Sequence, residues 1–184
     1  ILDILEIDYI EAPQSGESQA AYMTQTTPSV YGCSSDDYDA LLFNSAHTIR
    51  NITSPDNLEQ ITIRDTLNEL NITQQQLVDI AILCGTDYND GVYGYGPKKS
   101  LQAVQEENVE DIFIEENVEN YKEIRDIFLN PKVNRVDSVK QNLTNPELPK
   151  LHEYLYRILK FETDKFETQI NKMDENTQQT ISDW

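Results

Sequence analysis

Positive charge is scarce in this sequence. Its 184 residues include 14 Lys and Arg against 33 Asp and Glu, a formal net charge of −19 at pH 7. Proteins that bind nucleic acid normally carry a basic surface, so this balance argues at first sight against such a partner. Molar salt removes the objection, because the Debye length falls to about 3 Å and an acidic surface then keeps a protein hydrated without repelling DNA at range. The charge leaves two classes open: an acidic protein that never meets nucleic acid, or a halophilic one that does.

Long apolar runs and cysteines are also few. No stretch approaches the roughly 18 apolar residues that span a bilayer, and we expect no membrane partner. Cys33 and Cys84 lie in apolar stretches where buried thiols are common, and a pair of cysteines excludes a disulfide framework. With 38% hydrophobic residues the chain can bury a core, so we expect a globular, cytoplasmic protein. The sequence opens at Ile1 without a signal peptide, from which we expect a piece of a longer protein.

The first 64 residues predict an α/β region. A strand, a helix and a second strand follow one another, which is the outline of a βαβ unit with parallel strands. In such units functional groups collect beyond the carboxyl ends of the strands. The predicted elements are a strand at 7–12, a helix at 18–26, a strand at 29–34, a helical turn at 39–43 and strands at 48–52 and 59–63.

From Arg64 onward the pattern is helical. Apolar residues at helical spacing between Leu77 and Cys84 predict a helix that Thr73 caps and that Gly85 ends. A glycine-rich turn then leads into another helix with Pro97 in its first turn. Further helices are predicted at 109–114, 121–129, 149–160 and 165–173, with an extended polar stretch at 130–146 and a flexible tail over the last ten residues.

Acidic residues follow the predicted buried strand. Asp37 and Asp39 are two residues apart in an extended segment and therefore point the same way, while Glu17 follows the preceding strand and Asp87 the long helix. Carboxylates gathered at one edge repel one another unless a cation lies among them. Mg²⁺ binds through carboxylates and substrate phosphates, as a two-metal phosphodiesterase requires. The alternative is a solvated loop in a chain that is acidic throughout.

The glycine-rich turn is the second candidate for chemistry. Gly94 and Gly96 allow the backbone to approach a phosphate, and the helix that begins near Pro97 offers free N–H groups. Lys98 and Lys99 follow directly, in a chain poor in positive charge. These residues favour a phosphate contact, and the alternative is a tight structural turn with two exposed lysines.

Together these segments resemble the flap endonuclease family of XPG-like 5′ nucleases. Residues 7–22 are similar to the opening of the family's internal domain, residues 34–41 to its second acidic motif, and residues 79–99 to its third acidic motif and helix–two-turn–helix. The resemblance covers nearly the whole chain. It implies an α/β fold of the PIN-like 5′-nuclease kind, a parallel sheet with helices followed by a helical region. The implied division is 1–64 internal nuclease region, 65–130 helix–two-turn–helix region, 131–174 C-terminal helices and 175–184 tail.

The resemblance also implies a function, the cleavage of flapped or nicked double-stranded DNA in replication and repair. The residues that fall on the family's catalytic metal ligands, which hold two Mg²⁺ or Mn²⁺ ions, are Glu17, Asp37, Asp39 and Asp87. Those that fall on the turn that grips duplex DNA, where carbonyls often hold a K⁺ ion, are Gly91, Gly94, Gly96, Lys98 and Lys99. In the tail, Gln178, Ile181 and Trp184 resemble the start of a sliding-clamp-binding motif.

The sequence departs from the family in two places. Ser15 stands where the family has the first glutamate of a Glu-x-Glu pair, and a hydroxyl is a weaker ligand than a carboxylate, so we expect one metal to be held less tightly. The family's amino-terminal domain, with two further aspartates, is absent, and we expect the chain alone to lack a full catalytic site. Two other functions stay open: a catalytically impaired module that binds DNA structure or a sliding clamp, and an acidic α/β domain with no nucleic-acid role.

Overall fold

The structure is a computed structural model that describes residues 1–5, 7–106, 108–139, 148–158 and 160. Tertiary contacts divide the chain into two units, one made of residues 1–10 and 140–184 and the other of residues 11–139. Among the described residues, the first unit contains one helix, α8 (Leu148–Arg157), where the sequence predicts a helix at 149–160. The predicted helix at 165–173 and the predicted tail lie outside the described residues. None of the described helices is both long enough and apolar enough to cross a membrane.

A small mixed sheet lies in the second unit. Its strands are β1 (Cys33–Ser34), β2 (His47–Arg50) and β3 (Glu59–Thr62), in that spatial order. β1 and β2 are parallel and are joined through α2 (Asp39–Leu42), whereas β3 is antiparallel to β2. The predicted α/β class is confirmed. The last pair is antiparallel because the connection between its strands, which includes the short 3₁₀ helix η1 (Pro55–Asn57), is too short for a crossover.

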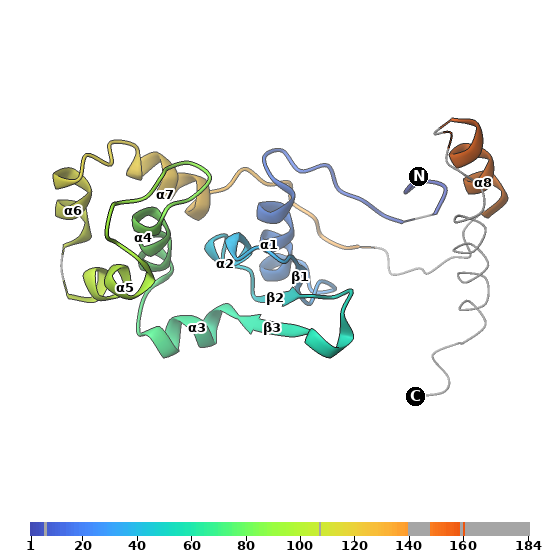
Figure 1. Ribbon diagram of the computed structural model, residues 1–184. Helices are drawn as coiled ribbons and strands as arrows, with labels where there is room; N and C mark the ends of the chain where they lie inside the picture. The colour runs from blue at the N-terminus through green and yellow to red at the C-terminus, as the bar shows by residue number, and fades with distance from the viewer. Residues whose placement is uncertain (6, 107, 140–147, 159, 161–184) are drawn as a thin grey trace. The chain divides into compact units, whose positions relative to one another are not determined.

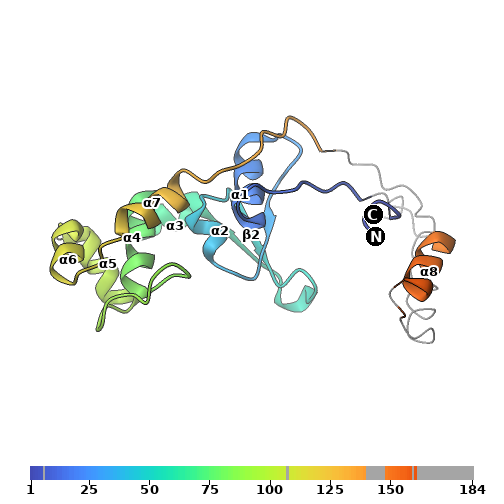
Figure 2. The same cartoon turned by 90° about the horizontal axis from the view of Figure 1, so that it is seen from above.

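Helix α1 (Gly16–Thr26) lies against the strands in both views (Figures 1 and 2). It begins after Ser15, whose hydroxyl accepts a hydrogen bond of 3.1 Å from the Ser18 N–H. The strand predicted at 7–12 is wrong, since none of these residues is in a strand. The Glu11 carbonyl instead accepts a hydrogen bond of 2.9 Å from the side chain of Asn134. Within the part of the chain that the structure describes, residues 7–12 pair with no strand.

A group of helices follows the sheet. Figure 1 shows α3 continuing from β3 and leading the chain to this group. The group consists of α3 (Ile63–Leu70), α4 (Gln74–Cys84), α5 (Pro97–Glu106), α6 (Val109–Glu115) and α7 (Tyr121–Leu129). The last four confirm the sequence prediction, including the Thr73 cap of α4, which is a capping box with Gln76. Helix α3 was not predicted; it begins directly after β3, at Ile63, a residue that falls in the strand predicted at 59–63.

Helices of this unit, including α1 and α2 beside the sheet, contribute to one apolar core. Val78, Ile82 and Leu83 of α4 are fully buried, and Phe128 of α7 packs on Phe43 at the end of α2 with ring centroids 4.9 Å apart. The core thereby fixes the end of α4 relative to the loop between β1 and α2, and both of these carry predicted site residues.

Of the two cysteines, Cys33 is buried as expected, but the prediction for Cys84 is wrong. Cys84 lies in the last turn of α4 and is exposed, with its Sγ 3.5 Å from the Ser100 hydroxyl. The apolar stretch around it is helical, so its core-facing positions are occupied by Ile82 and Leu83, which are fully buried.

Candidate metal centre and nucleic-acid interface

Three of the four predicted ligands meet at one end of the small sheet. Glu17 comes from the first turn of α1, Asp37 from the loop after β1, and Asp39 from the start of α2. One oxygen atom from each of these carboxylates lies within 4.8 Å of the other two. Asp37 is exposed and the other two side chains are half-buried. Three carboxylates from separate elements thus lie close enough together to bind one cation.

Ser35 links the Glu17 carboxylate to the backbone of Asp37. Its hydroxyl donates a hydrogen bond of 2.5 Å to Oε1 of Glu17 and accepts one of 3.1 Å from the N–H of Asp37. The Asp39 N–H in turn donates to Oδ1 of Asp37 at 3.2 Å. Sequence reasoning missed Ser35, although its position two residues before Asp37 in the acidic motif is a usable signal. These bonds hold the carboxylates in place while leaving oxygen lone pairs free.

The electrostatics of the cluster favour a cation. Burial, followed by the negative charges of Asp37, Glu17 and Asp87, raises the pKa of Asp39 to about 6. Asp87 is therefore close enough to act on Asp39 through its charge, although it is not part of the three-carboxylate group. A bound divalent cation relieves this repulsion, and carboxylate oxygens are the ligands that Mg²⁺ and Mn²⁺ prefer. The residues present fit such an ion.

Ser15, where the resemblance predicts a glutamate, has a structural task. Its hydroxyl caps α1 by accepting from the Ser18 N–H, and its carbonyl accepts from the Ser18 hydroxyl at 2.9 Å. A serine cap of this kind stabilises a helix by about 1 kcal/mol. Ser15 thus anchors the helix turn that carries Glu17.

The glycine-rich turn follows α4 as the sequence predicts. Gly91 has φ +79° and no room for a side chain, since a Cβ there would lie 2.6 Å from the carbonyl carbon of Cys84. The next residue, Val92, is buried and donates its N–H to the Leu83 carbonyl at 2.8 Å. Gly91 therefore lets the turn fold back tightly onto the end of α4.

Beyond this contact the turn faces solvent. A Cβ on Gly94 or Gly96 would meet nothing within 4 Å, so both leave open space at the backbone. Lys98 and Lys99 are exposed in the first turn of α5, which begins at Pro97 as predicted. The Lys99 ammonium lies 3.7 Å from the centre of the Tyr95 ring. The turn offers open backbone and two cations together, as a phosphate contact requires.

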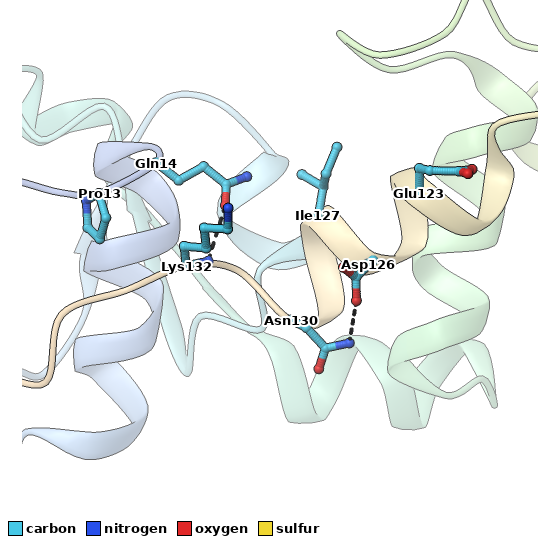
Figure 3. Close-up of a pocket in the computed structure, with 7 residues that line it drawn as sticks. All are labelled: Pro13, Gln14, Glu123, Asp126, Ile127, Asn130 and Lys132. Carbon is cyan, nitrogen blue, oxygen red and sulfur yellow. Dashed lines mark hydrogen bonds between the residues drawn. The ribbon is translucent and has the colours of Figure 1, made fainter.

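A hollow of about 430 Å³ lies elsewhere in the same unit (Figure 3). Its lining is Pro13, Gln14, Glu123, Asp126, Ile127, Asn130 and Lys132. The Lys132 N–H donates to Oε1 of Gln14 at 3.1 Å, and Asn130 donates to Asp126 at 2.9 Å. None of the predicted site residues lines it. The predicted clamp-motif residues Gln178, Ile181 and Trp184 lie outside the described residues.

Comparison with known sequences gives relatives in one family. The XPG I-region family matches residues 6–87. Along its full length the chain is 38% identical to flap endonuclease 1 of Methanococcus aeolicus, of which it covers 58%. It is 48% identical over 106 residues to flap endonuclease 1 of Halobacterium salinarum, an alignment that covers 58% of this chain and 32% of the relative. The chain thus spans less than two thirds of the length of the relatives it matches.

Solved structures agree with the sequences. The flap endonuclease-1 structure from Methanococcus jannaschii matches with a TM-score of 0.76 and 34% identity, covering 93% of this chain and 54% of that one. The catalytic core of Rad2 in complex with DNA substrate matches with a TM-score of 0.68 and 23% identity, over 87% of this chain and 62% of that one. At that identity the second match shows a shared fold.

Proposed function

We propose that the chain belongs to the flap endonuclease family of XPG-like nucleases and is part of a structure-specific 5′ flap endonuclease. The full protein would hydrolyse DNA phosphodiesters at flap junctions during replication and repair, in the cytoplasm. The observation that carries the proposal is the convergence of Glu17, Asp37 and Asp39. An acidic cluster at the end of a strand in this fold is the site at which a metal-dependent nuclease holds its ions.

We further propose that Glu17, Asp37, Asp39 and Asp87 hold two Mg²⁺ or Mn²⁺ ions. Bound divalent ions would supply stabilisation of phosphate charge and a water molecule of lowered pKa. Asp39 must lose its proton to act as a ligand, and its pKa of about 6 allows that at neutral pH. Ser35 would orient Glu17 and the loop of Asp37. Since relatives extend beyond this chain, the remaining ligands would come from the rest of the protein.

The glycine-rich turn is the proposed duplex contact. Lys98 and Lys99 would bind backbone phosphates without reading the base sequence, and Gly91, Gly94 and Gly96 would let the backbone approach the duplex. Carbonyl oxygens of the turn are the proposed ligands of a K⁺ ion. We also retain Gln178, Ile181 and Trp184 as proposed contacts to a sliding clamp, on the sequence pattern alone.

Activity is tested in a chimera. The segment of the Methanococcus aeolicus flap endonuclease that precedes the region aligned with this chain is fused to Ile1, and cleavage of a labelled 5′ flap duplex is measured with Mn²⁺ at molar KCl. The chimera should cut at the junction, and the Asp37→Asn/Asp39→Asn chimera should lose at least about 100-fold in rate, because the ligands of the metal are removed. Equal rates for both chimeras would contradict the assignment of the carboxylates.

Ser15 favours a second candidate, a module that binds DNA structure but cleaves poorly. The hydroxyl is committed to capping α1 and supplies no charge to a metal. In the chimera, Ser15→Glu should then raise the cleavage rate by about tenfold or more while flap affinity stays constant. A parent chimera as fast as the Ser15→Glu chimera would exclude this second candidate.

A further inference from the structure

Tyr93 stands out among the tyrosines of the described residues by its exposure. Its relative exposure is 102%, so the side chain is as open to solvent as in an extended peptide. The residue before it, Val92, is 9% exposed, and Tyr95 is half-buried beneath Lys99. The backbone around Tyr93 is therefore anchored while its ring is not.

The local backbone explains why the ring projects outward. The Tyr95 N–H donates to the Val92 carbonyl at 3.0 Å, which makes a β-turn with Tyr93 and Gly94 at its central positions. Gly94 has φ +82°, the value that a type II turn requires at its second central residue. The bond from the Val92 N–H to Leu83 fastens this turn to the end of α4. Tyr93 is thus presented by a fixed turn.

The charge around Tyr93 indicates its partner. Residues 91–100 contain Lys98 and Lys99 and no acidic residue, in a chain whose net charge is −19. The exposed phenol of Tyr93 and the two cations that follow five and six residues later match a ligand that carries both negative oxygens and apolar faces. The DNA backbone has both, since phosphates alternate with deoxyribose rings, and side-chain hydroxyls of tyrosine are common donors to phosphate oxygens.

We propose that Tyr93 is an uncharged contact to the DNA backbone, with its hydroxyl donating to a phosphate oxygen and its ring packing on the neighbouring deoxyribose. This assignment rests on the proposed DNA-binding function. A tyrosine contact neutralises no phosphate and releases no counterion, whereas each lysine contact weakens as salt rises. Tyr93 thereby contributes affinity that molar salt does not remove.

The test is the salt dependence of flap binding. Affinity of the chain for a labelled 5′ flap duplex is measured by fluorescence anisotropy over a KCl series. Tyr93→Phe should weaken binding about tenfold or more at every salt concentration, as the loss of one hydrogen bond to a charged group does, and Tyr93→Ala should weaken it further. Neither should change the slope of log K against log [KCl]. Lys98→Ala should reduce the size of that slope by about 0.9.

Tyr9→Phe is the matched control, because Tyr9 is also exposed, at 60%, and should bind as the parent does. If Tyr93→Phe equals Tyr9→Phe, the proposed hydrogen bond is wrong, and if Tyr93→Ala also binds as the parent does, the whole contact is wrong. A parent chain that binds no flap duplex at any salt concentration would instead overturn the proposed DNA-binding function. A change of slope in Tyr93→Phe would contradict an uncharged contact.

Discussion

At the scale of single residues, the candidate site depends on a serine as much as on its carboxylates. Ser35 is the one side chain that bonds both to Glu17 and to the backbone of Asp37 among the hydrogen bonds of the described residues. Side chains that orient ligands from behind typically contribute 10- to 100-fold to metal affinity. We therefore expect Ser35 to strengthen ion binding by orienting Glu17 and the Asp37 loop.

Replacing Ser35 tests that role. Ser35→Ala should weaken Mn²⁺ binding by about tenfold, because Glu17 loses its donor and the Asp37 loop loses its acceptor. Ser35→Thr keeps the hydroxyl and should bind Mn²⁺ as the parent does, and this rescue separates orientation from folding. Ser34→Ala, at the exposed neighbouring position, is the control. Equal Mn²⁺ affinity in Ser35→Ala and Ser34→Ala, measured by calorimetry, would refute the role.

Asp39 gives a prediction about pH. Its pKa in the folded chain is about 6, above the ordinary value of 3.8, so the folded state binds more protons than the unfolded state between these pH values. The free energy of unfolding should therefore fall as pH rises from about 4 to about 6. Asp39→Asn removes this contribution and should be more stable than the parent at pH 7.

The expected difference between Asp39→Asn and the parent is on the order of 1 kcal/mol, because solvent screens a half-buried group. It is measured as the difference in free energy of urea unfolding at pH 4 and pH 7, without metal. Saturating Mn²⁺ at pH 7 should stabilise the parent and not the variant. A difference between the two proteins that is the same at both pH values would contradict the raised pKa.

The sequence predicted the carboxylates but not the groups that hold them. Glu17, Asp37 and Asp39 follow recognisable elements and match a family pattern, so their convergence was foreseeable. Ser35 was missed because its partner Glu17 is remote in sequence, and such a contact follows only from tertiary structure. Ser15 was seen only as a missing ligand, although its cap on α1 is a local and recognisable pattern.

At the scale of elements, local patterns predicted the helices well and the strands poorly. Helices α4 to α7 have their own apolar spacing, and α4 also has a capping box, so their signals lie within the segment itself. Strand pairing depends on remote partners. Residues 7–12 have none, and of the predicted strand at 29–34 only Cys33 and Ser34 pair with β2. The unpredicted α3 shares its first residue with the end of the predicted strand at 59–63.

A buried ion pair joins three of the helices. Arg125 of α7 forms two hydrogen bonds with Asp79 of α4, at 2.6 and 3.1 Å, and one of 2.7 Å with Glu110 of α6. The Asp79 side chain is 1% exposed. Burial raises the pKa of Asp79 despite the neighbouring guanidinium, which shows how costly this carboxylate is to bury. The pair fixes how α4 meets α6 and α7.

Replacing Arg125 alone should lower the free energy of unfolding more than replacing both Arg125 and Asp79. Arg125→Met should lower the free energy of unfolding by about 3 kcal/mol, because it leaves the Asp79 carboxylate buried without a counter-charge. The double variant Arg125→Met/Asp79→Leu should recover most of that loss, and urea unfolding measures both. If the double variant loses as much free energy of unfolding as the two single variants together, the attraction between the two charges exceeds the cost of removing them from water.

At the scale of the whole molecule, the excess of acidic residues sets the conditions in which the chain is stable. A net charge of −19 on 184 residues destabilises a compact state by self-repulsion at low salt. At molar salt the Debye length is about 3 Å, so repulsion between charges farther apart than this is largely screened. The similarity to the Halobacterium salinarum flap endonuclease agrees with this composition.

We therefore expect the melting temperature to rise by about 5 °C or more between 0.2 and 2 M KCl, roughly 1–2 kcal/mol for a chain of this length. Sucrose of equal osmolality, which does not screen charge, is the control and should raise the melting temperature less. Circular dichroism follows both series. An equal rise in sucrose and in KCl would contradict charge screening as the cause.

A calorimetric titration of Mn²⁺ into the chain at molar KCl tests the metal site directly, with the variants Ser15→Glu and Asp37→Asn/Asp39→Asn measured beside it. We predict that the parent binds Mn²⁺, that the added carboxylate at position 15 strengthens binding, and that the double asparagine variant abolishes it. Binding in the double asparagine variant as tight as in the parent, or no binding in any of the three, would contradict a metal site at these carboxylates.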